Sequence, residues 1–134
     1  MTVYLLPYRN FGRLGIKMKN EVIEKILDRF AEMNTAQINA LVAVNFGEWR
    51  KNEGSLAEWN PAGNPNHAHD LIDKLMSDGL FINLYGRPND WTCEILDKTA
   101  KIYAEVTTTS MPRAVCEAAL ITVLTKYGQM IKVD

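Results

Sequence analysis

The stretch Val106-Thr107-Thr108-Thr109-Ser110-Met111-Pro112-Arg113-Ala114-Val115-Cys116-Glu117-Ala118-Ala119-Leu120 decides the fold. It begins as a β-strand and becomes a long helix through a run of hydroxyl side chains. A Ser or Thr before a helix caps free backbone N–H groups, and Pro fits only in the first turn. The helix carries small residues at Ala114, Ala118 and Ala119, which allow close approach to a sheet. We therefore expect a last helix from about Met111 to Tyr127, packed on a sheet.

The same junction is a candidate anion site. A helix start collects partial positive charge and unpaired donors, and Arg113 adds a full charge close to Thr109. The alternative is that one hydroxyl caps the helix and the others are ordinary strand threonines. An anion site predicts that Arg113→Glu abolishes binding and leaves the thermal midpoint nearly unchanged.

A helix and three strands precede this junction. The pattern predicts a helix from Pro65 to Ser77 and strands at Leu80–Tyr85, Trp91–Leu96 and Lys101–Thr108. The predicted fold class is α+β, a three-stranded antiparallel sheet with helices packed on it, in αα-αβββα order and αβα sandwich-like. One face of the sheet is apolar and comprises Leu80, Ile82, Leu84, Cys93, Ile95, Ile102, Ala104 and Val106.

The opposite face of the predicted sheet is too aromatic to be simply solvated. Phe81, Tyr85 and Tyr103 lie on it among polar residues. Exposed apolar patches of this kind usually mark contacts. The N-terminal helices, a second subunit or a ligand could each cover this face.

The N-terminal part divides into an arm at residues 1–19 and the start of a single domain at residues 20–134. The arm is purely basic, and it is compatible with a flexible leader, an arm or an edge strand. Asn20 begins a helix with apolar residues at helical spacing. Asn34-Thr35 begins a second helix, which Gly47 is expected to end. These two helices could pack on the domain or mediate self-association.

Length and composition indicate one folded, soluble domain. The chain has 134 residues, 47% of them hydrophobic, and a net charge of −1. No apolar run approaches the roughly 20 residues of a membrane span. The first residues do not resemble a signal peptide, so the cytoplasm is the expected location. The charge gives no general attraction to nucleic acid or anionic membranes.

Two tryptophans lie in the stretch from Glu48 to Asn64, where helical periodicity lapses. Long loops are often functional. Trp49 and Trp59 could pin this segment to the core, or one of them could stack on a planar ligand such as a nucleobase.

Catalytic and metal motifs are weak. His67 and His69 are two residues apart, so on a helix they point to nearly opposite sides, and the chain has no third His. Cys93 and Cys116 are too few and too widely spaced for a disulfide scaffold or a zinc site, and we expect reduced core residues, although the sequence alone also allows the two to pair. We expect no metal, no cofactor and no enzymatic activity.

The helix–strand–strand–strand–helix order is also that of a double-stranded RNA-binding domain. Such a domain needs cations at the start of its last helix. Here that helix offers Arg113 alone, with Glu117 one turn later, which counts against RNA binding.

From about Met33 onward the chain resembles the phage αβα-sandwich domain family of bacteriophages. The segments that carry the resemblance are Ile38-Asn39-Ala40-Leu41-Val42-Ala43 leading to Trp49, Trp59-Asn60-Pro61 before Asp70-Leu71-Ile72-Asp73-Lys74-Leu75, Trp91-Thr92-Cys93, and Pro112-Arg113-Ala114-Val115-Cys116-Glu117-Ala118-Ala119-Leu120. The family in turn looks similar to the Thoeris anti-defence proteins, which sequester cyclic ADP-ribose isomers made by bacterial TIR enzymes, and some of which hold cyclic oligonucleotides.

This resemblance implies a phage protein that binds a cyclic nucleotide signal without cleaving it, in the host bacterial cytoplasm. It also implies a homo-oligomer, a dimer or a larger assembly of dimers, with ligand sites at subunit interfaces. Trp49 and Arg113 are the positions best carried over, followed by Trp91, Trp59 and Asn60. A second class of function is a phage accessory protein that blocks a host complex through the aromatic sheet face or the basic arm.

Overall fold

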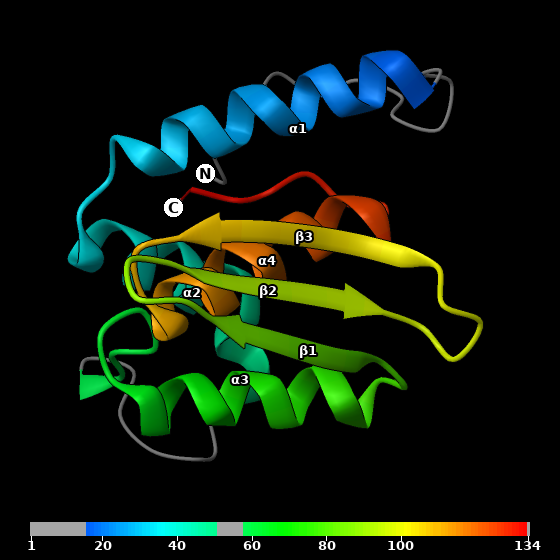
Figure 1. Ribbon diagram of the computed structural model, residues 1–134. Helices are drawn as coiled ribbons and strands as arrows, with labels where there is room; N and C mark the ends of the chain where they lie inside the picture. Colours follow the sequence, from blue (N-terminus) through cyan, green and yellow to red (C-terminus); the bar gives the residue numbers. More distant parts are fainter. Residues whose placement is uncertain (1–15, 51–57, 134) are drawn as a thin grey trace.

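Helix α4 (Met111–Thr125) is the central element of the structure, a computed structural model that describes residues 16–50 and 58–133 and the side chains of residues 21–47 and 58–133. It packs on strands β2 and β3 on one side and on helices α1, α2 and α3 elsewhere (Figure 1). Twelve of its fifteen residues are buried. Three of them, Ala114, Ala118 and Ala119, are fully buried alanines that let neighbouring elements approach closely.

The other elements follow the predicted order. They are α1 (Ile16–Ala31), α2 (Thr35–Arg50), α3 (Pro65–Ser77), β1 (Phe81–Gly86), β2 (Trp91–Leu96) and β3 (Ile102–Thr108). The strands form one antiparallel sheet in the order β1-β2-β3. The α+β fold class and the αα-αβββα order are therefore confirmed.

The inner face of the sheet is the predicted one, with one exception. Cys93, Ile95, Ala104 and Val106 are buried against α4. Ile102 was expected there too, but its side chain is 51% exposed. The reason is a register shift, because Ile95 pairs with Ala104 whereas Leu96 pairs with Ile102. The extra residue in β3 reverses the side on which Ile102 lies.

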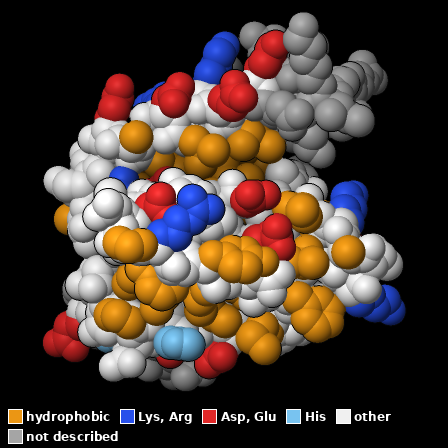
Figure 2. All heavy atoms as spheres, viewed as in Figure 1, with side chains coloured by type: hydrophobic (Ala, Val, Ile, Leu, Met, Phe, Trp, Pro, Cys, Tyr) orange, Lys and Arg blue, Asp and Glu red, His pale blue; other side chains and the backbone are white. Residues whose placement is uncertain are grey.

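The outer face of the sheet is open. Phe81 and Tyr85 of β1 are 55% and 51% exposed on it. Figure 2 shows hydrophobic side chains spread over this side of the molecule, with acidic side chains among them. Helices α1 and α2 pack on α4, at one edge of the sheet and behind it, so they leave this face uncovered (Figure 1).

Helix boundaries agree with the sequence where capping residues set them. Asn64 caps α3, its side chain accepting a hydrogen bond from the N–H of Asn66. Asn34 caps α2 in a reciprocal pair with Gln37: each backbone N–H donates to the other's side-chain oxygen, at 2.8 and 2.9 Å. This is a capping box.

Two predicted boundaries are wrong. Helix α1 begins at Ile16, so Asn20 lies inside it and does not begin it. Helix α2 continues through Gly47 to Arg50, and Gly47 is buried. A glycine inside a helix costs only about 1 kcal/mol relative to alanine, which packing readily offsets. Residues 16–19, which were predicted to belong to the arm, are part of α1. Residues 1–15 of the predicted arm lie outside the described part of the chain.

Enlarging a buried alanine of α4 tests its central position. We expect Ala118→Leu to lower the free energy of unfolding by about 1–3 kcal/mol, because a well-packed site has no room for three more carbon atoms. Urea denaturation would measure the change, with Ala31→Leu on the exposed end of α1 as the matched control. Equal stability of the two variants would contradict close packing around α4.

Candidate functional site

The strand-to-helix junction is built as a helix cap. Thr107 and Thr108 end β3, and the Ser110 side chain accepts a hydrogen bond from the N–H of Arg113 at 3.4 Å. Thr109 is exposed between them. The hydroxyl side chains therefore have the roles that the simpler alternative predicted: Ser110 caps the helix, and Thr107 and Thr108 are strand residues.

Trp91 lies at the same end of the sheet as the junction. It is the first residue of β2 and pairs with Thr108 in the register. Its ring is held over Gly86, where an added Cβ would come within 2.8 Å of the indole. Trp91 as a whole is half-buried, and Thr109, which follows its partner Thr108, is exposed.

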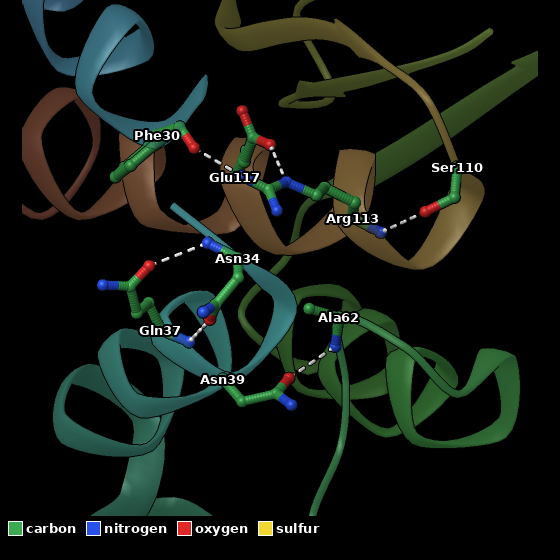
Figure 3. Close-up of polar contacts among 8 residues, drawn as sticks. All are labelled: Phe30, Asn34, Gln37, Asn39, Ala62, Ser110, Arg113 and Glu117. Carbon is green, nitrogen blue, oxygen red and sulfur yellow. Dashed lines mark hydrogen bonds and ion pairs between the residues drawn. The ribbon is translucent and has the colours of Figure 1, made fainter. Parts of the chain in front are cut away.

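Arg113 is engaged inside the protein. Its Nε donates to Glu117 Oε2 at 2.7 Å, and its Nη2 donates to the carbonyl oxygen of Phe30 at the end of α1. The side chains of Arg113 and Glu117 are 13% and 6% exposed. Figure 3 shows the guanidinium directed toward Glu117 and the α1–α2 turn. Arg113 thus ties α4 to the N-terminal helices.

Burial also affects the proton affinity of Glu117. Burial raises the pKa of this carboxyl above its ordinary value of 4.5, and the hydrogen bond and charge of Arg113 partly offset the effect. An anion that bound Arg113 would compete with Glu117 for the guanidinium. An anion at the start of α4 would therefore meet the partial positive charge of the helix end and the exposed Thr109. The guanidinium of Arg113 is already bound to Glu117.

A second group of predicted residues surrounds a pocket beside α2, which we call the α2 pocket. It has a volume of about 300 Å³ and is lined by Ala36, Asn39, Ala40, Ala43, Glu58, Trp59 and Asn60. Alanines at spacings of four and three residues form a smooth strip along the helix. Trp59 is only 4% exposed, so it forms a wall of this pocket and pins its segment to the core.

Hydrogen bonds fix the polar side of the α2 pocket. Asn39 Nδ2 donates to Asn60 Oδ1 at 2.6 Å, and Asn39 Oδ1 accepts from the N–H of Ala62 at 2.8 Å (Figure 3 shows the latter). The N–H of Asn60 donates to His67 Nδ1 at 2.8 Å. His67 therefore positions this segment, whereas His69 is exposed.

Gly63 packs directly against Asn60. A Cβ at Gly63 would lie 2.7 Å from both terminal atoms of the Asn60 side chain. That separation is shorter than any normal contact, so any larger residue at Gly63 would displace the amide. The close approach holds the Asn60 side chain in the orientation that Asn39 requires.

The predicted site residues thus form two groups with separate partners. Arg113, Thr109 and Trp91 belong to the junction, and Trp59 and Asn60 belong to the α2 pocket. Trp49 lies in the last turn of α2, and its side chain is outside the described residues. Asn39 was not among the predicted site residues, although the alanines around it, at positions 36, 40 and 43, were a visible signal.

The described parts of the chain give no support for a metal site or for a reactive cysteine. Residues 16–50 and 58–133 contain no group of three or more His, Cys, Asp or Glu side chains that could hold a metal ion. Cys93 and Cys116 are buried and unpaired with each other, as expected. Burial raises the pKa of Cys93 to about 12, which disfavours its reactive thiolate. None of the described helices is long and apolar enough to span a membrane.

The comparisons with known proteins give one family. The model of the phage ABA sandwich domain matches residues 40–120, more than half of the chain. The match covers most of α2, the α2 pocket apart from Ala36 and Asn39, the sheet, and α4 as far as Leu120, but not α1. No curated protein and no solved structure gives a significant match.

Removing Arg113 should destabilise the fold, contrary to the nearly unchanged midpoint that an anion site alone predicts. We expect Arg113→Ala to cost about 3–5 kcal/mol, because it leaves the buried Glu117 without its partner. Chemical denaturation would measure this loss. Arg87→Ala, which removes an exposed partner of Asp90, is the control and should have little effect. A wild-type midpoint for Arg113→Ala would show that the ion pair contributes nothing.

Glu117 also predicts a pH dependence. A carboxyl whose pKa is raised by folding stabilises the folded state fully below its unfolded pKa, near 4.5, and this contribution is lost as the pH rises through the folded pKa. The stability of the wild type relative to Glu117→Gln should therefore fall as the pH rises from about 4.5 through the raised pKa of the folded state. Denaturation at a series of pH values would test this, with Glu105→Gln as an exposed control. A rising difference would mean that Arg113 outweighs burial.

Proposed function

Because the chain belongs to the phage ABA sandwich domain family, we propose that it is a phage anti-defence protein that sequesters a cyclic nucleotide immune signal without cleaving it. The expected ligands are cyclic ADP-ribose isomers, with cyclic oligonucleotides as further candidates. This ligand class rests on the resemblance to the Thoeris anti-defence proteins. The protein would act in the host bacterial cytoplasm as a homo-oligomer.

The α2 pocket is the observation that carries the proposal. Its volume of about 300 Å³ is at the lower end of the range of small-molecule sites, roughly 300–1,000 Å³. Amides such as Asn39 and Asn60 provide both donors and acceptors, as the edge of a nucleobase requires. Both are held in place before any ligand arrives, which reduces the entropic cost of binding. The alanine strip of α2 supplies a smooth wall for a flat ring.

The phosphates of such a ligand need a separate partner. Among the described residues that line the α2 pocket, Glu58 is the only charged one, and it would repel them. The junction offers the start of α4, Thr109 and Trp91. We therefore propose that the complete site lies between two subunits, with the α2 pocket of one and the junction of the other. Phosphate binding by Arg113 and stacking by Trp49 stay predictions.

Calorimetry with cyclic ADP-ribose isomers tests the ligand class. We expect Ala40→Trp, which fills the α2 pocket from an exposed position, to weaken binding by roughly 100-fold. The same substitution at Ala31, exposed on α1, is the control and should bind normally. No heat with any isomer or cyclic oligonucleotide would overturn the proposal. Recovery of intact ligand after incubation, and not of a hydrolysed product, distinguishes sequestration from catalysis.

The open outer face of the sheet favours a second candidate function. Phe81 and Tyr85 are half-exposed there, and large exposed aromatics are common in protein interfaces. A phage accessory protein could use this face to block a host complex. Purification from infected cells separates the two candidates, because a boiled extract that releases a nucleotide favours sequestration and a stoichiometric host protein favours inhibition.

A further inference from the structure

An apolar row crosses the three strands on the outer face of the sheet. The register places Phe81, Leu96 and Ile102 side by side, one from each strand. Phe81 and Ile102 are more than half exposed, and Leu96 is half-buried. Exposed apolar side chains that gather in one place usually mark a contact surface. The apolar row therefore favours contact with another surface over contact with water.

An acidic row lies next to the apolar row. It contains Asn83, Glu94 and Glu105, which are also register partners. Asn83 Nδ2 donates to Glu94 Oε1 at 3.0 Å, and this bond holds the carboxylate on the outer face. Glu105 lies between the buried Ala104 and Val106, so its side chain points outward as well. Like charges directly opposite each other on adjacent strands destabilise a sheet, and a partner with positive charge would offset that cost.

Basic residues lie beyond the other side of the apolar row, at what we call the basic end. Lys98 follows Leu96 by two residues in the turn after β2, and Lys101 directly precedes β3. Both lysines are exposed. Figure 2 shows acidic side chains near the middle of this face and basic side chains at the end where β2 stops and β3 begins. The order along the strands is therefore acidic, apolar and basic.

This order is self-complementary. A two-fold axis that crosses the strands above the apolar row turns a second copy end for end, with each strand opposite its own counterpart. The apolar rows of the two copies then meet, and the acidic row of each copy faces the basic end of the other. Sheets that pack face to face lie about 10 Å apart, a gap that side chains from both faces fill. Two-fold contacts in which one surface meets itself are the commonest in soluble oligomers.

Other arrangements of two copies fit the charges less well. An axis along the strands would place the acidic row of one copy on the acidic row of the other. An axis one row beyond the acidic row would place Glu94 opposite Arg87 and Asp90, whose charges cancel. The apolar row is therefore the centre that the charges favour.

We propose that the protein forms a dimer through this face, with the two-fold axis above the apolar row and the acidic row of each copy opposite the basic end of the other. The contact uses neither the α2 pocket nor the junction, so it goes beyond the proposed function and needs no bound ligand. A face of three strands is small, and the dimer belongs to the weak class of interfaces that bury less than about 1,200 Å².

Exchange of the charges tests this dimer. One variant combines Glu94→Lys with Glu105→Lys, and the other combines Lys98→Glu with Lys101→Glu. In each variant alone, like charges meet across the axis, so self-association should weaken at least about tenfold. In an equal mixture of the two variants, opposite charges meet at both contacts, and a heterodimer should form. Sedimentation equilibrium without ligand measures both results.

Two outcomes would overturn the proposal. One is a wild-type protein that stays monomeric up to about 1 mM, which would leave the outer face to a different protein. The other is a mixture of the two variants that associates no better than either variant alone. If a variant does not fold, the wild type still provides a test, because salt screens the charges and should weaken the dimer. A dimer that salt leaves unchanged would contradict the charge pairing.

Two control variants locate the contact. Arg87→Glu changes an exposed cation at the opposite end of the sheet and should dimerise like the wild type. Ala40→Trp fills the α2 pocket and should also dimerise normally, so loss of ligand binding and loss of this dimer are separate results. If Ala40→Trp abolished the dimer, the contact would lie at the α2 pocket and the proposal would be wrong.

Discussion

Burial of α4 on almost every side is the constraint on which the rest of the structure depends. A helix so enclosed can contain a polar group only if the group has a partner, since an unpaired buried charge costs several kcal/mol. Thr122 satisfies this by bonding to the carbonyl of Ala118 one turn earlier. Glu117 satisfies it through Arg113, which also reaches the carbonyl of Phe30. One internal charge therefore orients α1 against the core.

The fold was largely predictable because its signals are local. Alternating strands, an asparagine followed by proline at the start of α3 and the serine before α4 each act over a few residues. The predictions that failed are those in which contacts with residues distant in the sequence determine the local structure. Gly47 is buried, so packing carries α2 through it, and an extra residue in β3 turns Ile102 outward.

The candidate site was less predictable for the same reason. A hydroxyl run before a helix predicts a cap, and the four-residue spacing of Arg113 and Glu117 already favours an ion pair. The sequence gives no indication that Phe30 supplies the second acceptor, since it lies 83 residues away. Likewise the bond between Asn39 and Asn60 joins two segments whose relation appears only in three dimensions.

The hydrogen bonds that join α2 to α3 have a consequence for how relatives of this protein can diverge. Asn39 and His67 fix the chain at Asn60, directly after residues 51–57, and α2 fixes it before them. A segment whose ends are both anchored by the scaffold can change in length cheaply, at about 0.6 kcal/mol for each doubling. Changes of length between Arg50 and Glu58 would therefore leave the fold and the hydrogen bonds at Asn60 in place. The scaffold on both sides stays constant while this part of the sequence varies.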